Sequence, residues 1–89
     1  MEQIIRNKFA ELNESASAKW EDNKELSLER YKNENGNIYI TIGIGKWNTT
    51  YHDVQIDTQS LKYVVIRESK RNAILYDVIL YVIMPLVSI

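Results

Sequence analysis

The sequence has no cysteine, one proline, three glycines and no surplus of either charge in its 89 residues. Without cysteine there is no disulfide framework and no cysteine-ligated zinc site. Lysine and arginine number 11 against 12 aspartates and glutamates, so both the basic surplus of a nucleic-acid module and the acidic surplus of a DNA mimic are missing. Hydrophobic residues make up 45% and aromatic residues 10%, which excludes a disordered chain. We expect one globular domain over residues 1–89.

The first segment predicts an amphipathic helix. Its apolar residues recur at steps of three and four and form one stripe: Ile5, Phe9, Leu12, Ala16 and Trp20. Glu2 falls in the first turn, where the helix dipole favours an acid. We expect this helix to end near residues 21–23.

Two alternating segments follow, over residues 26–29 and 38–44, as in half-buried strands. The turn residues between them, Glu34-Asn35-Gly36, predict a hairpin. A three-residue loop sets Leu28 opposite Ile42, whereas a two-residue loop would set Leu28 opposite a glycine. Because one residue of slip turns every side chain to the other face, the hydrophobic match favours three residues.

Two more strands are expected, over residues 51–57 and 61–67, which completes a four-stranded antiparallel meander. On the fourth strand we expect Val64 and Ile66 to face inward. A slip of one residue, which would suit Leu61 and Val65, is the alternative for this strand.

The last segment predicts a second helix. Pairs of apolar residues recur every four positions: Ile74, Leu75, Val78, Ile79, Val82, Ile83 and Leu86. Ser69 is the expected N-cap, and Pro85 is expected to stop or kink the helix. The many β-branched residues make a strand near residues 80–84 the alternative. The expected fold is therefore α+β, with an N-terminal helix, a four-stranded meander and a C-terminal helix, both helices on one sheet face.

This last helix is apolar on nearly every side, because residues 73–89 carry one charge, Asp77. A membrane span needs about 20 apolar residues, so seventeen with an acid among them disfavour a membrane anchor. A buried core helix is one way to cover it. The side of the helix that faces away from the sheet is also apolar, so homodimerisation through this helix is the other way to cover it. The expected dimer contacts are Tyr76, Leu80, Tyr81 and Met84.

The sheet face opposite the helices is expected to bind a partner. The expected registers place Tyr31, Tyr39 and Tyr63 in one row, and tyrosine offers a large rigid contact area with a polar tip. A loop residue, Trp47, would serve either as a binding anchor or as a cap on the core. The high strand propensity of tyrosine is the alternative explanation of the row. The expected partner-binding residues are Tyr31, Tyr39, Trp47, Asp53, Tyr63 and Arg67.

Signals for catalysis are few. The single histidine, His52, is expected to face inward as a structural residue rather than act as a general base. Its neighbour Asp53 points to the other face of the strand, so the two form no dyad. No cofactor or metal is expected. Binding of nucleic acid is disfavoured because two acidic residues, Glu29 and Asp53, share the outer face. Arg67 is the only positively charged residue expected there, and phosphate contacts need more positive charge than that.

These features favour a non-catalytic protein-interaction module that inhibits or regulates another macromolecule, of the antitoxin, immunity or phage anti-defence type. The alternative is a protein that binds a small ligand or nucleotide at a dimer interface or on the tyrosine face. A small nuclease using His52 is a third hypothesis. Met1-Glu2-Gln3 does not resemble a signal peptide, so we expect a cytoplasmic protein.

Overall fold

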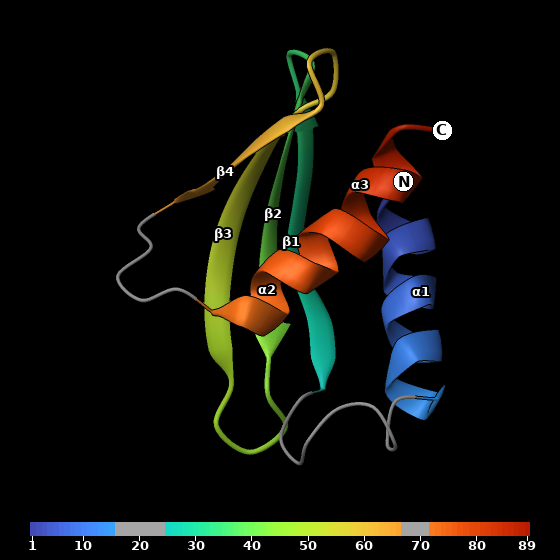
Figure 1. The fold of residues 1–89 in the computed structure, drawn as a ribbon, viewed down its shortest axis with the longest axis vertical. Coiled ribbons are helices and arrows are strands. Elements are labelled where there is room, and N and C mark those ends of the chain that lie inside the picture. Colours follow the sequence, from blue (N-terminus) through green and yellow to red (C-terminus); the bar gives the residue numbers. More distant parts are fainter. Residues whose placement is uncertain (16–24, 67–71) are drawn as a thin grey trace.

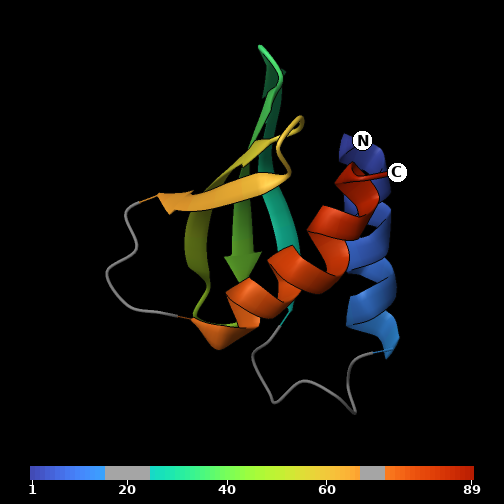
Figure 2. The same cartoon turned by 45° about the horizontal axis from the view of Figure 1, so that its top comes forward.

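The computed structural model describes residues 1–15, 25–66 and 72–89, and its fold is α+β as expected. In chain order the elements are α1 (Glu2–Ser15), β1 (Leu26–Glu34), β2 (Asn37–Ile44), β3 (Thr50–Asp57), β4 (Lys62–Ile66), α2 (Ala73–Val78), η2 (Ile79–Ile83) and α3 (Met84–Val87). The strands form an antiparallel meander in the order β1-β2-β3-β4. The helix α1 and the C-terminal helical run lie on the same side of this sheet (Figures 1 and 2).

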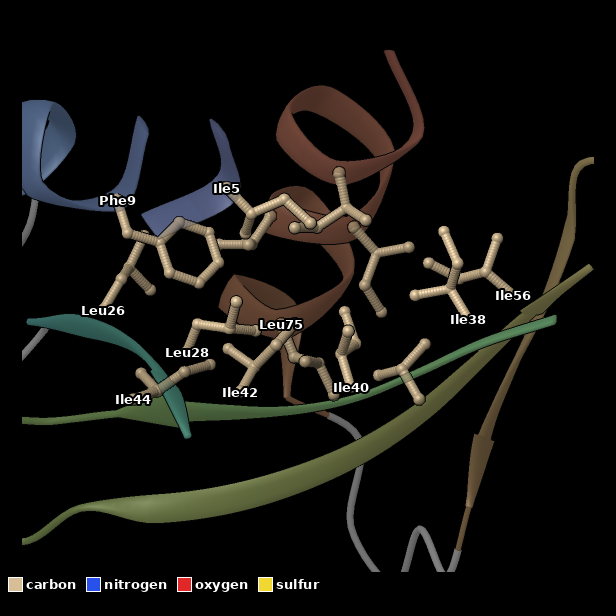
Figure 3. Close-up of a cluster of buried hydrophobic side chains, with 14 residues drawn as sticks. Ile5, Phe9, Leu26, Leu28, Ile38, Ile40, Ile42, Ile44, Ile56 and Leu75 are labelled. Carbon is tan, nitrogen blue, oxygen red and sulfur yellow. The ribbon is translucent and has the colours of Figure 1, made fainter. Parts of the chain in front are cut away.

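The core fills the space between this helix layer and one face of the sheet (Figure 3). The expected stripe of the first helix supplies Ile5 and Phe9, and Leu12 is partly buried beside them. Ala16, Trp20 and the expected end of that helix lie outside the described residues. The other buried members are Leu26, Leu28, Ile38, Ile40, Ile42, Ile44, Val54, Ile56, Leu75, Val78, Ile79 and Ile83. Each such side chain stabilises the fold by about 1.5–3 kcal/mol when it leaves water.

Two side chains of α1 cover the outer edge of β1. The Asn13 side chain accepts a hydrogen bond from the Leu26 N–H and donates one to the Leu26 carbonyl, both at 2.8 Å. Arg6 donates to the Leu28 carbonyl. These contacts satisfy backbone groups that would otherwise form an open sheet edge, which is prone to pairing with other chains.

The first hairpin corrects the expected loop. Asn35 and Gly36 form a two-residue turn, both with positive φ (53° and 79°), as in a type I′ turn. Leu28 nevertheless lies opposite Ile42, as expected. Both facts hold because the register shifts between Leu28 and Arg30, where a β-bulge adds one residue to β1. Beyond the bulge the side chains of β1 lie on the opposite faces from those expected.

The register of the fourth strand differs from the expected one. Its turn includes Leu61, at φ 56°, so the loop is one residue longer than expected and Asp57 pairs with Lys62. A shift of one residue in register moves every side chain of a strand to the opposite face of the sheet. Val65 therefore packs against the core, whereas Val64 and its neighbour Ile66 are exposed, so the expected inward pair was wrong and the slipped register is correct.

The C-terminal segment is helical rather than a strand. Its N-cap is Asn72, whose side chain accepts hydrogen bonds from the N–H groups of Ile74 and Leu75. The expected cap, Ser69, lies outside the described residues. Before Pro85 the helix widens: the Met84 N–H bonds to the Ile79 carbonyl, five residues earlier. A proline lacks an N–H and crowds the preceding turn of an α-helix, and the wider π-helical turn carries the helix past it without a stop.

Asn13→Ala should lower the free energy of unfolding by about 1–2 kcal/mol, because two hydrogen bonds to the β1 edge are lost and Leu26 keeps its partly buried backbone groups. Urea unfolding followed by circular dichroism measures the change. Asn33→Ala, at an exposed position of the same strand, is the matched control and should stay within about 0.5 kcal/mol. Equal effects of the two variants would contradict the role assigned to Asn13.

The turn after β3 should make stability depend on pH through Asp57. The backbone N–H groups of Gln59 and Ser60 donate to its carboxylate and lower the pKa of Asp57 below its usual value. A lowered pKa in the folded state gives stability that is present above the unfolded pKa and lost as pH falls through the folded one. Asp57→Asn should therefore be less stable than the parent near neutral pH, and the gap should narrow on acidification. Urea midpoints measured between pH 7 and pH 2 test this, and a constant gap would contradict it.

Candidate functional site

The outer face of the sheet is not covered by either helix (Figures 1 and 2). It carries polar and apolar side chains side by side. The registers align two rows across the four strands. The first row is Lys32, Tyr39, Gln55 and Val64, and the second is Arg30, Thr41, Asp53 and Ile66. Between the two middle strands, Tyr39 lies opposite Gln55 and Thr41 lies opposite Asp53.

The expected row of three tyrosines does not form. Tyr39 lies on the outer face, but Tyr31 pairs with Ile40 and Tyr63 pairs with Ile56, so both rings turn toward the core. The bulge in β1 reverses Tyr31, and the longer turn before β4 reverses Tyr63. The outer face therefore holds Tyr39 and, toward its other end, Tyr51, which is 63% exposed.

A hollow of about 570 Å³ lies on this face and extends around the edge of β1 to the start of α1. We call it the outer-face hollow. Its lining residues are Glu2, Arg6, Glu29, Arg30, Tyr31, Lys32, Tyr39, Ile40, Thr41, Asp53, Val54 and Ile66. The structure thus brings together three of the expected partner-binding residues, Tyr31, Tyr39 and Asp53.

Most charges in the outer-face hollow have partners within the chain. Arg6 pairs with Glu2 at 3.1 Å, and Glu29 accepts a hydrogen bond from Ser27 at 2.9 Å. Asp53 accepts a hydrogen bond from Thr41. Lys32, which also lines the hollow, pairs at 2.5 Å with Glu34, which does not, and this carboxylate raises the pKa of the Lys32 ammonium.

Arg30 is the exception, because its guanidinium has no hydrogen-bond or ion-pair partner within the described parts of the chain. It lies on the outer face, exposed, opposite Thr41 and diagonally across from Tyr39. A guanidinium presents five donors in a planar fork that fits a carboxylate or phosphate. Arginine and tyrosine are also the side chains that most often dominate protein–protein binding. The hollow can therefore take an anionic group at Arg30 and pack against the ring of Tyr39.

The remaining expected partner-binding residues lie elsewhere. Trp47 is in the β2–β3 loop, 77% exposed, with the Lys46 ammonium 5.3 Å from its ring centre. The β2–β3 loop lies at the opposite end of the sheet from the two-residue turn (Figure 1). Tyr63 packs on the helix side, with its ring centre 6.3 Å from that of Tyr76. Arg67 lies outside the described residues.

The expected dimer residues divide into two pairs. Tyr76 contacts Tyr63, and Met84 packs against the core, so both are partly buried within the chain. Leu80 and Tyr81 are 47% and 76% exposed. A second hollow of about 440 Å³, the terminal groove, runs between the start of β4 and the C-terminal helix. It is lined by Leu61, Tyr63, Leu80, Met84, Pro85 and Ser88.

His52 pairs with Ile42 and lies at the margin of the core face, as expected. Its Nε2 is 2.9 Å from the Thr50 hydroxyl. Among residues 1–15, 25–66 and 72–89, no three histidine, aspartate or glutamate side chains gather closely enough to hold a metal ion. None of the helices in these ranges has the length and apolar character needed to cross a bilayer.

Sequence reasoning missed Arg30 and Lys32 as outer-face residues. With the expected loop, both would point into the core beside the isoleucines of β2. Burying unpaired charges costs several kcal/mol, so this conflict itself signalled a change of phase in β1. The apolar Tyr31 between them fits the same shift. The sequence of β4 held no such signal, because Tyr63 to Ile66 are all apolar or amphipathic.

The positions of the tyrosines can be checked by stability. Tyr63→Ala should lower the free energy of unfolding by about 2 kcal/mol or more, because a ring packed on the core and on Tyr76 is removed. Tyr51→Ala, on the exposed outer face, is the matched control and should change it by about 0.5 kcal/mol or less. Urea unfolding measures both, and the reverse order would contradict the register of β4.

No family model, no curated protein and no solved structure matches this chain.

Proposed function

We propose that this protein is a non-catalytic module that binds another protein through the outer-face hollow. The observation that carries the proposal is Arg30, an exposed guanidinium without a partner among the described residues, in an open hollow that also holds Tyr39 and Ile66. Such a site combines an anion-binding fork with a rigid ring and an apolar wall. An acidic, partly apolar segment of a partner protein fits it.

The charges around Arg30 restrict the kind of anion that the site can bind. Asp53 is engaged by Thr41 and Glu29 by Ser27, so neither carboxylate is paired with the guanidinium. Both carboxylates still carry a negative charge, so they repel any part of a bound anion that lies away from Arg30. We infer a partner with one or two well-placed carboxylates rather than a polyanion, which also disfavours nucleic acid.

The broader role that we propose is inhibition or regulation of that partner, of the antitoxin, immunity or phage anti-defence type, in the cytoplasm. This step rests on analogy with other small binding chains.

A second candidate function is binding of a nucleotide or another small anion at the same place. The volume of the hollow, about 570 Å³, falls in the range of small-ligand sites, and Arg30 beside Tyr39 would hold a phosphate and stack a base. Calorimetry of the purified protein against a panel of nucleotides separates the two. Micromolar binding of a nucleotide that is lost in Arg30→Ala would favour this second function.

For the first function, the tagged protein is used to capture its partner from the native host, and the purified pair is then measured by calorimetry. Arg30→Glu and Tyr39→Ala should each weaken binding by about tenfold or more, because each removes an anchor of the hollow. Gln59→Ala, in the exposed turn before β4, is the matched control and should bind as the parent does. Unchanged affinity of both hollow variants, with their fold retained, would overturn the proposal.

A further inference from the structure

The two edges of the sheet are treated differently. On the first part of β1, before the bulge, Asn13 bonds to both outward backbone groups of Leu26 and Arg6 bonds to the carbonyl of Leu28. At β4, the other edge, no side chain or backbone group in the described parts of the chain hydrogen-bonds to the side that faces away from β3. An open edge carries unpaired N–H and C=O groups and pairs readily with another strand.

The register identifies which backbone groups lie on that open edge. In an antiparallel pair, residues alternate between those that direct their backbone groups to the partner strand and those that direct them away. Asp57 and Lys62 flank the turn and belong to the first kind, since a hairpin closes on a bonded pair. It follows that Tyr63 and Val65 direct their N–H and C=O groups outward, away from β3.

The side chains on both sides of this edge are apolar. On the outer face Val64 is 60% exposed, with Ile66 beside it. On the helix face the terminal groove opens between Leu61 and Leu80, both large and exposed. Figure 2 shows the C-terminal helix passing beneath β4. Edge strands are normally blunted by charge, proline or a bulge, and β4 carries one charge, Lys62, at its start.

We propose that two copies of this chain pair through β4, antiparallel, about a two-fold axis at Val64. In this register Tyr63 lies opposite Val65 of the partner subunit, so the outward backbone groups of the two copies bond to one another. All five residues of β4 take part, and the two sheets join into one. The strand is self-complementary in this register, which is what a two-fold interface requires.

Two further features favour a second copy over a strand of another protein. Lys62 lies opposite the partner's Ile66 rather than the partner's Lys62, so like charges do not meet. Val64 lies opposite the partner's Val64, and each covers the other's exposed side chain. This dimer is built on a strand and thus differs from the helix-mediated dimer expected from the sequence.

The test uses charge at residue 64. Val64→Lys and Val64→Glu each place two like charges face to face at the axis and should raise the dimer dissociation constant by about tenfold or more. An equimolar mixture of the two variants should dimerise at least as well as the parent, because Lys then faces Glu. Sedimentation equilibrium at tens of micromolar measures all three, and circular dichroism confirms the fold. Lys at this exposed site should not disturb the core.

A cross-link gives an independent readout, because the chain has no cysteine of its own. Val64→Cys should form a disulfide dimer rapidly under copper-phenanthroline oxidation, since opposed non-bonded pairs bring Cα atoms to about 4.5 Å. Lys62→Cys is the matched control: its copies would lie four residues apart along the strands, about 13 Å, beyond disulfide reach. It should cross-link slowly.

Three results would overturn the proposal. The first is a parent protein that stays monomeric at these concentrations. The second is a dimer that is indifferent to charge at residue 64 but lost in Tyr81→Lys, which would indicate a helix contact. The third is equal cross-linking at both cysteine positions. The binding test on Arg30 and Tyr39 is separate, so either proposal can fail while the other stands.

Discussion

The isoleucine ladder of β2 is the constraint on which the other elements depend. Ile38, Ile40, Ile42 and Ile44 occupy alternate positions of a central strand and are all buried on one face. Both neighbouring strands must bring apolar side chains to that face, and both helices must cover it. On β3 the regular alternation of a strand is enough to bring its apolar side chains to that face. On β1 the apolar positions fit only if the strand changes phase, and the bulge between Leu28 and Arg30 makes that change.

The order and type of the elements could be predicted because the periodicity of each long segment is clear. The isoleucine ladder of β2 predicts a strand, and the paired apolar residues of the last segment predict a helix. The register near the turns was harder to predict. A preference for the two-residue Asn35-Gly36 turn and a preference for Leu28 against Ile42 conflict, and the chain satisfies both by adding a bulge. The position of Leu61 in a left-handed turn has no local signature.

These one-residue differences matter more for the site than for the fold. The core is built from the same apolar residues in most places, whether or not β4 slips. The outer face changes its character, from a row of tyrosines to a mixed surface around Arg30 and Tyr39. The same slip moves Val64 and Ile66 from the core to the surface. The two surfaces proposed for binding, one for a partner and one for a second copy, both follow from registers set by short turns.

The meander also has a consequence for how the chain folds. Each strand pairs with its neighbour in sequence, so the sheet can assemble one hairpin at a time with short loops to close. The two turns at one end are already tied together, since Thr58 donates from its N–H and its hydroxyl to the Gly36 carbonyl. The helices differ, because they come from opposite ends of the chain and have no neighbour in sequence to pack against except a strand. Because both pack on the same sheet face, their docking joins the most distant parts of the chain.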